Sequence, residues 1–283
     1  MTTTDPKAIP IPPQDIAANA AVTAGAEPLI RVERAADHVA LLTLNAPKLR
    51  NALTAEMRNE LRAALATLAA DDQVHVLVIT GAAGNFCAGG DVRTMGETDP
   101  AKICARMTEV AETALAVASF PKPVIAAVAG HAAGAGVSLA CLADMVVAEE
   151  TSQFTFSFLR LALGPDWGLS WSLARRVGAT QARGLILSRG VIDGREAERI
   201  GLADQLASEG ETQLRAVALA KEVCNGPRAA IAAVKTMMSE LDGLREALAA
   251  ETAMQLERFP GWEHQEGAKA FKEKRAADYT QKI

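Results

Sequence analysis

The sequence is poor in cysteine, with four cysteines among 283 residues and no Cys-x-x-Cys pair. Cys87, Cys104, Cys141 and Cys224 lie far apart, and none has a histidine at metal-ligand spacing. A disulfide framework and a zinc site are therefore not expected, and no metal is predicted. This cysteine usage is typical of reduced thiols in a cytoplasmic protein.

The sequence also lacks an excess of positive charge. It has 29 Lys and Arg against 34 Asp and Glu, which gives a net charge of -5. Binding to nucleic acid needs basic side chains that neutralise phosphates. We therefore expect no nucleic-acid partner. The apolar fraction of 49% is large enough for a packed core in a chain of this length.

One uncharged run is long enough to cross a bilayer but has the wrong composition. Residues 124–143 carry no charge and contain a GxxxG pair at Gly130 and Gly134. The run consists mostly of alanine and glycine, includes His131, and changes from β-branched to glycine-rich. This pattern predicts a buried strand, a turn and a buried helix. No membrane partner is expected.

Proline gathers at the N-terminus, where five of the 12 prolines lie in the first 28 residues. A segment so rich in proline buries little apolar surface, so residues 1–28 are predicted to form a disordered leader. Residues 29–210 alternate strand and helix patterns, whereas residues 211–283 are helical throughout. The chain therefore divides into a sheet-based body and a helical C-terminal region.

Hydrophobic periodicity predicts the following elements. Strands are expected at residues 30–32, 38–44, 74–80, 124–128, 145–148 and 154–156. Helices are expected after Thr54, at 101–118, after Gly136, and at 169–177, 181–187, 194–200, 211–223 and 228–257, with an amphipathic segment at 266–279. Strands that alternate with helices indicate an α/β fold.

Two glycine-rich turns follow buried strands, at residues 86–92 (FCAGGDV) and 130–136 (GHAAGAG). Small residues let the backbone approach a ligand, and N–H groups at a helix start can bind an anion. Side by side, the two turns could direct two N–H groups at one oxygen and so stabilise an oxyanion. The glycines could also serve close packing alone. Neither turn matches GxGxxG or the P-loop, so a nucleotide site is not predicted.

An ordered series of motifs resembles the crotonase (enoyl-CoA hydratase/isomerase) superfamily. The motifs are LNAPKLRNAL at 44–53, ITG at 79–81, FCAGGD at 86–91, KPVIAAVAG at 122–130, AD at 143–144, GPD at 164–166, LARRVG at 173–178, GLAD at 201–204, EG at 266–267 and EKR at 273–275. The resemblance covers about residues 30–280. It implies a spiral of ββα units with a helical C-terminal trimerisation region. It also implies a homotrimer or a dimer of trimers.

The same resemblance implies an acyl-CoA thioester as substrate and no separate cofactor, since coenzyme A enters with the substrate. The two oxyanion donors fall on the N–H groups of Gly90 and Ala135. Ala135 stands where the family commonly has glycine, which is compatible with a negative φ. The implied contacts with substrate and coenzyme A are Lys48, Leu49, Arg50, Ala88, Gly90, Asp91, Val92, Arg93, Ser138, Phe158 and Lys274, with Arg275 beside the last. The charged residues among them could equally be ordinary solvated side chains.

The sequence departs from the family at the two water-activating glutamates of hydratases, whose positions hold Ser138 and Phe158. Serine is a poor base at neutral pH and phenylalanine cannot take a proton. Asp166, in Pro165-Asp166, resembles the aspartate of the isomerase branch, which moves a proton along the acyl chain. Asp166 could instead cap the helix that follows.

The leading prediction is therefore a double-bond isomerase that works through a thioester enolate held in an oxyanion hole. An enoyl-CoA hydratase would need a second carboxylate from Glu97, Glu109 or Glu112. An aryl-CoA dehalogenase-like hydrolase would keep a nucleophilic aspartate at position 166, but no histidine lies between Val92 and Phe120 to pair with it. A non-catalytic acyl-CoA binding protein is the remaining alternative.

No histidine is assigned to catalysis. His38 and His75 lie in strand patterns, and His131 follows Gly130 in the second glycine-rich turn. His264 is predicted to be solvated.

Overall fold

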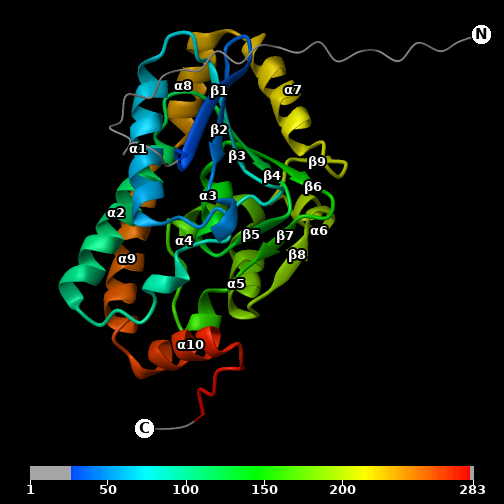
Figure 1. Cartoon of the computed structure of the whole chain (residues 1–283). Coiled ribbons are helices and arrows are strands. Elements are labelled where there is room, and N and C mark those ends of the chain that lie inside the picture. Colours follow the sequence, from blue (N-terminus) through cyan, green and yellow to red (C-terminus); the bar gives the residue numbers. More distant parts are fainter. Residues whose placement is uncertain (1–26, 281–283) are drawn as a thin grey trace, which may run out of the picture.

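The structure is a computed structural model that describes residues 27–280. The predicted leader therefore lies outside the described residues, apart from its last two positions. The elements are arranged around a central sheet, with helices on both of its faces (Figure 1).

The main sheet has six strands in the order β1-β2-β3-β4-β6-β9. These strands are β1 (Ile30–Ala36), β2 (Val39–Leu44), β3 (Val76–Gly81), β4 (Val124–Val128), β6 (Met145–Glu149) and β9 (Gln205–Ala207). β1 pairs antiparallel with β2, and all the other pairs are parallel. A smaller sheet joins β5 (His131–Ala133), β7 (Gln153–Thr155) and β8 (Val191–Asp193).

Both faces of the main sheet are buried at its inner strands β2, β3, β4 and β6, which explains why these strands are almost continuously apolar. On one face, Leu42 and Ile79 belong to the larger core, which α1 (Ala55–Ala70), α2 (Pro100–Ala118) and α3 (Ala135–Leu142) complete. On the other face, Leu41 and Val78 pack against α7 (Thr212–Cys224). Parallel strands covered on both sides need apolar residues at every position.

The remaining helices complete the fold around the two sheets. They are η1 (Pro47–Leu49), η2 (Val92–Thr94), η3 (Phe158–Leu161), α4 (Leu169–Val177), α5 (Ala179–Leu187), α6 (Gly194–Arg199), α8 (Arg228–Met238), α9 (Leu241–Arg258) and α10 (Trp262–Glu273). α9 runs beside α2 (Figure 1), and it also packs on α4. α10 packs against η3. The division of the chain at residue 210 stays a prediction.

The uncharged run at 124–143 folds as the strand β4, the short strand β5 and the helix α3. The expected strand and helix are confirmed, whereas the segment predicted as a turn also contains β5. Among residues 27–280, no helix combines the length and the apolarity that a bilayer crossing requires.

The single helix predicted at 228–257 is wrong, because it is divided into α8 and α9. Glu240 has a φ of 43°, in the left-handed region where a right-handed helix cannot continue. Its carboxylate pairs with Arg175 of α4 at 2.6 Å. A tertiary contact therefore accompanies the break, and the sequence has no glycine or proline at residues 239–241 to signal it.

Candidate active site

The two glycine-rich turns lie side by side. Cys87 N donates to His131 O at 3.0 Å, and Ala133 N donates to Cys87 O at 2.9 Å. At Gly89, which has a φ of 94°, a Cβ would lie 2.5 Å from Ala133 O and 3.4 Å from Ala135 N. Only glycine fits this approach, so the backbones of the two turns are held in direct contact.

Backbone N–H groups in both turns make no hydrogen bond within the part of the chain that the structure describes, and the two predicted oxyanion donors are among them. Gly90 N is one of these donors. The other is Ala135, the first residue of α3, where an N–H has no partner within the helix. Ala135 is not among the residues with a positive φ, so alanine in place of glycine costs no backbone strain there. The end of a helix with spare N–H groups favours negative charge.

Cys87 lies in the first turn but is a poor nucleophile. Complete burial raises the pKa of its thiol to about 12. The thiol therefore stays protonated at neutral pH, and only a thiolate is strongly nucleophilic.

The loop that carries Lys48, Leu49 and Arg50 runs alongside the first turn. Ala88 N donates to Arg50 O at 2.9 Å, and Leu53 N donates to Gly89 O at 2.8 Å. The structure thus brings the predicted coenzyme A residues 48–50 next to residues 88–90. The Lys48 and Arg50 side chains are exposed.

A buried asparagine, which sequence reasoning missed, holds this loop. Asn51 is fully buried and donates to Ala82 O at 2.9 Å and Asn85 O at 2.7 Å. Its Oδ1 accepts from Ala46 N at 3.0 Å. The amide thereby ties the loop to the start of the first turn.

The other predicted coenzyme A residues differ in their surroundings. Asp91 accepts from Arg93 N and pairs with the Arg93 guanidinium at 2.8 Å, which holds the pKa of Asp91 below its ordinary value. Val92 begins η2. Lys274 is the exposed C-cap residue after α10, and Arg275 pairs with Glu266 and Glu273 at the surface. No hydrogen bond or ion pair within residues 27–280 joins Lys274 or Arg275 to the 48–50 loop.

Ser138 and Phe158 both lie next to the second turn. Ser138 is fully buried, and its hydroxyl donates to Gly134 O at 3.4 Å. A Cβ at Gly134 would lie 3.9 Å from Phe158 Cε1. Neither side chain brings a carboxylate to this turn.

Asp166 sits in a strained loop before α4. The next two residues, Trp167 and Gly168, have φ values of 59° and 72°. A buried tryptophan in the left-handed region is unfavourable, by about 1–3 kcal/mol for such residues in general. The loop is held by its surroundings against its own backbone preference, as functional loops often are.

The Asp166 carboxyl group has the surroundings of a general base. Its Oδ1 is buried and has no hydrogen-bond partner among the described residues. Burial, followed by the nearby Glu251 carboxylate, raises the pKa of Asp166 to about 7. Arg106 and Arg58 oppose this rise through their positive charge. A carboxyl group of this kind exchanges a proton readily near neutral pH.

α9 holds the Asp166 loop in place. Glu251 accepts from Gly168 N at 2.7 Å, and from Ser170 N at 2.9 Å and Ser170 Oγ at 2.6 Å. Gln255 donates to Gly164 O at 3.0 Å. Glu251 therefore caps α4, whose own N-cap makes no side-chain hydrogen bond. The capping role considered for Asp166 is wrong.

Sequence reasoning missed Arg106, which lies beside the first turn. A Cβ at Gly90 would lie 3.5 Å from Arg106 Nη2. Arg106 Nη1 donates to Thr94 Oγ1 at 2.9 Å, and the guanidinium lies 5.4 Å from the centre of the Phe259 ring. Opposite charge couples Arg106 to Asp166. Arg106, beside the first turn, is thus linked electrostatically to Asp166.

The three glutamates that could supply a second carboxylate are not equivalent. Glu109 pairs with the buried Arg58 at 2.7 Å. Glu97 accepts from Thr98 N and Asp99 N, and Glu112 is exposed. Only Glu109 is coupled electrostatically to Arg106, and its carboxylate is already engaged.

The predicted solvent exposure of His264 is wrong, because α10 packs over the segment around Gly96. His264 is fully buried. Its Nδ1 donates to Leu161 O at 2.7 Å, and its Nε2 accepts from Gly96 N at 3.3 Å. Burial lowers the pKa of this histidine, which favours the neutral ring that both contacts require.

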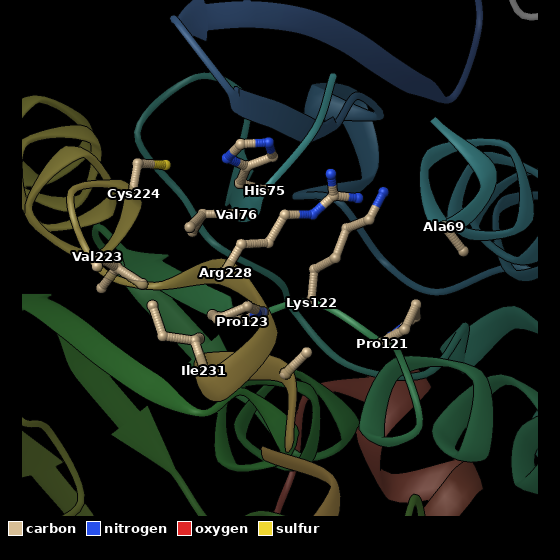
Figure 2. A pocket seen from close by; sticks show the side chains of 12 residues that line it. Ala69, His75, Val76, Pro121, Lys122, Pro123, Val223, Cys224, Arg228 and Ile231 are labelled. Carbon is tan, nitrogen blue, oxygen red and sulfur yellow. The ribbon is translucent and has the colours of Figure 1, made fainter. Parts of the chain in front are cut away.

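Three cavities of about 240, 550 and 840 Å³ are not lined by Gly90, Ala135 or Asp166, although the second is lined by Gly84 and Ala129, which precede the two turns. Figure 2 shows the smallest, where the Lys122 and Arg228 side chains extend in the same direction near His75. Lys122 Nζ donates to Leu68 O and Asp71 O, and Arg228 pairs with Asp72. These cations already have partners in the fold.

The chain is similar to known proteins over most of its length. A family model described as enoyl-CoA hydratase/isomerase matches residues 34–282. A probable enoyl-CoA hydratase from Rhodobacter capsulatus is 38% identical over 245 residues, which cover 86% of this chain and 94% of that protein. The 1,2-epoxyphenylacetyl-CoA isomerase from Escherichia coli is 33% identical over 250 residues, which cover 86% of this chain and 95% of that protein.

A solved structure has the same architecture. The enoyl-CoA hydratase from Mycobacterium avium subsp. paratuberculosis superposes with a TM-score of 0.80 at 29% identity. The match covers 89% of this chain and 99% of that one.

Proposed function

Because the chain belongs to the enoyl-CoA hydratase/isomerase family, we propose that it is an isomerase that shifts a double bond in an acyl-CoA thioester. Family membership establishes an acyl-CoA enzyme, and the expected α/β crotonase fold is confirmed. The preference for isomerisation rests on the site. Its main support is Asp166, whose buried Oδ1 has no partner among the described residues.

In the proposed mechanism, the thioester oxygen accepts hydrogen bonds from the N–H groups of Gly90 and Ala135. Asp166 removes a proton from C2 of a 3-enoyl thioester, and the electron pair moves onto the carbonyl oxygen to form a dienolate. Asp166 then returns the proton to C4, and the double bond forms between C2 and C3. A single oxyanion donor typically contributes ~10²–10³ in rate, because negative charge develops on this oxygen.

The proposed base depends on two features of Asp166, which are its raised pKa and the fixed position of its loop. A pKa of about 7 leaves a large fraction of Asp166 ionised at neutral pH and makes it a stronger base than an exposed aspartate. The hydrogen bonds from Gly168 and Ser170 to Glu251 hold the loop that carries it. Glu251 is therefore a positioning residue in this proposal.

The coenzyme A contacts and the assembly remain proposals as well. Lys48 and Arg50 are exposed beside the first turn, where they can reach a phosphate of the coenzyme A arm. A homotrimer or dimer of trimers is supported by exposed apolar side chains on α8, including Met237 and Met238, which are 75% and 65% exposed. The cytoplasmic location also stays a prediction.

A dehalogenase-like hydrolase is less well supported, because it needs a histidine beside the aspartate. His264 is coupled to Arg106 but has both ring nitrogens bonded to backbone groups. It therefore has no nitrogen available to activate water. A non-catalytic binding protein does not need an aspartate whose buried Oδ1 lacks a partner among the described residues, because such an arrangement is unfavourable.

Hydration of crotonyl-CoA is expected to stay at background. Each acid–base group normally contributes ~10²–10⁴ in rate, and Ser138 and Phe158 occupy the two positions of the hydratase glutamates. The loss of enoyl absorbance should be followed beside a family hydratase as a positive control. Turnover of roughly 1–10³ per second, the ordinary enzyme range, would contradict the proposal and direct attention to Glu109.

A further inference from the structure

We propose that Arg106 binds a second carboxylate on the acyl group, so that the substrates are thioesters of dicarboxylic acids with coenzyme A. This inference deepens the proposed function. It rests on that function only in placing the thioester at the turns of Gly90 and Ala135.

The position of Arg106 is the first observation. It extends from α2, and both its Nη2 and Met95 Cε, at 3.5 and 3.6 Å, lie next to the space that a Cβ at Gly90 would occupy. Thr94 and the ring of Phe259 hold the other side of the guanidinium. The side chain is therefore fixed beside the first turn.

The spare hydrogen-bonding capacity of this guanidinium is the second observation. Within residues 27–280, only Nη1 donates a hydrogen bond, and it donates to Thr94. Nε and Nη2 have no partner there. Arg58, which is coupled to Arg106, has a buried Nε that is also unpartnered. The unused donors beside the first turn are therefore those of Arg106, whereas the other Arg58 nitrogens already bond Leu53 O and Glu109.

The charges around Arg106 are the third observation. No carboxylate forms an ion pair with it in the described structure. Asp91 is paired with Arg93, and Glu109 is paired with Arg58. Asp166 attracts Arg106 without forming an ion pair, and His264 is neutral. The positive charge of Arg106 is therefore not neutralised by a direct contact.

These observations favour a carboxylate over a purely apolar acyl group. Arginine presents parallel N–H donors that match a carboxylate in two hydrogen bonds. An apolar chain packed against Arg106 would remove water from the guanidinium and leave its charge unpaired, which is strongly unfavourable. A second carboxylate on the substrate would satisfy the charge and the unused donors together.

Binding of saturated thioesters tests this inference without any need for turnover. Isothermal titration should compare glutaryl-, adipoyl- and suberoyl-CoA with pentanoyl-, hexanoyl- and octanoyl-CoA, which match them in chain length. We expect at least one dicarboxylic ligand to bind about 10–100-fold more tightly than its partner, as a charged hydrogen-bonded pair typically allows. Arg106→Met should abolish the preference, and Arg106→Lys should retain part of it.

Arg199→Met is the matched control, because Arg199 is an exposed arginine on α6 that pairs with Glu196. It should leave the preference unchanged, and circular dichroism should show that each variant is folded. The inference would be overturned if the dicarboxylic and monocarboxylic thioesters of each chain length bound with equal affinity. It would also be overturned if Arg106→Met still preferred the dicarboxylic thioesters.

A failure of the proposed isomerase function can be distinguished from a failure of the inference about Arg106. A wild-type protein that prefers dicarboxylic ligands but isomerises neither 3-hexenedioyl-CoA nor 3-hexenoyl-CoA would support the role of Arg106 and contradict the isomerase. Isomerisation of these thioesters without a preference for dicarboxylic ligands would support the isomerase and contradict the role of Arg106.

Discussion

Replacing Asp166 with asparagine is expected to lower the isomerisation of a 3-enoyl-CoA by ~10²–10⁴, the usual contribution of a general base. Asparagine has almost the same size but cannot accept the proton from C2. The affinity for the thioester should change little, because Gly90 and Ala135 bind through backbone N–H groups. Initial rates and dissociation constants of the two proteins give both quantities.

Asp193→Asn is a matched control for this change. Asp193 also precedes a helix, but it accepts a hydrogen bond from Glu196 N as an ordinary cap. Asparagine is an equally good capping residue, so this variant should keep its activity. Unchanged isomerisation in Asp166→Asn would exclude Asp166 as the base.

Stability provides a second readout of the Asp166 variant. The pKa of Asp166 is about 7 in the folded protein, above its ordinary value of 3.8, so the folded state holds this proton more tightly than the unfolded state. The tighter binding of this proton stabilises the folded state at a pH below the ordinary pKa of aspartate. The stabilisation is lost as the pH rises through the pKa of Asp166 in the folded protein. Asp166→Asn should therefore gain thermal stability relative to wild type between about pH 4 and about pH 8. If Asp166 were instead a capping residue with an ordinary pKa, the variant should keep the stability of wild type across this pH range, because asparagine is an equally good cap.

Substituting alanine for Gly136 is expected to lower turnover by ~10²–10³, the cost of misplacing an oxyanion donor. A Cβ at this position would lie 2.3 Å from the backbone oxygen of Cys87. A backbone atom cannot rotate away as a flexible side chain can, so the second turn must shift relative to the first. The shift changes the distance between the N–H groups of Gly90 and Ala135.

Gly184→Ala is the control for Gly136→Ala, because both glycines lie in helices. Around Gly184, in α5, nothing lies within 4 Å of an added Cβ. Alanine favours a helix interior over glycine, so Gly184→Ala should be at least as stable as wild type and fully active. A folded Gly136→Ala protein with normal turnover would show that the two turns do not form the oxyanion hole.

The parts of the fold and the site that were predictable have strong local signals. Apolar strands followed by glycine-rich turns predicted β3 and β4 and the contact between residues 86–92 and 130–136. Asp166 was found because Pro165 and Asp166 belong to a motif. Each of these features depends on neighbours in the chain, so a single sequence contains the information.

The missed parts depend on contacts between distant elements. Arg106 lies on a predicted helix, but only the packing of α2 beside the first turn brings it to Gly90. The burial of His264 and the break at Glu240 have the same kind of origin. For Glu251 a signal was available, because it follows Leu244 and Leu248 on the buried side of α9. A carboxylate on an apolar helix face needs a partner, and here the partners are the N–H groups of α4.

The most direct test of the account is the pH dependence of kcat/KM for the 3-enoyl-CoA that the wild-type protein converts fastest. Only the ionised form of Asp166 can accept the proton, so kcat/KM should rise about tenfold per pH unit in acid and level off above an apparent pKa near 7. Asp166→Asn should be slow at every pH and lose this profile. A wild-type rate that stays constant from about pH 5 to about pH 8, or an Asp166→Asn variant that keeps the wild-type profile, would contradict the assignment of Asp166 as the base.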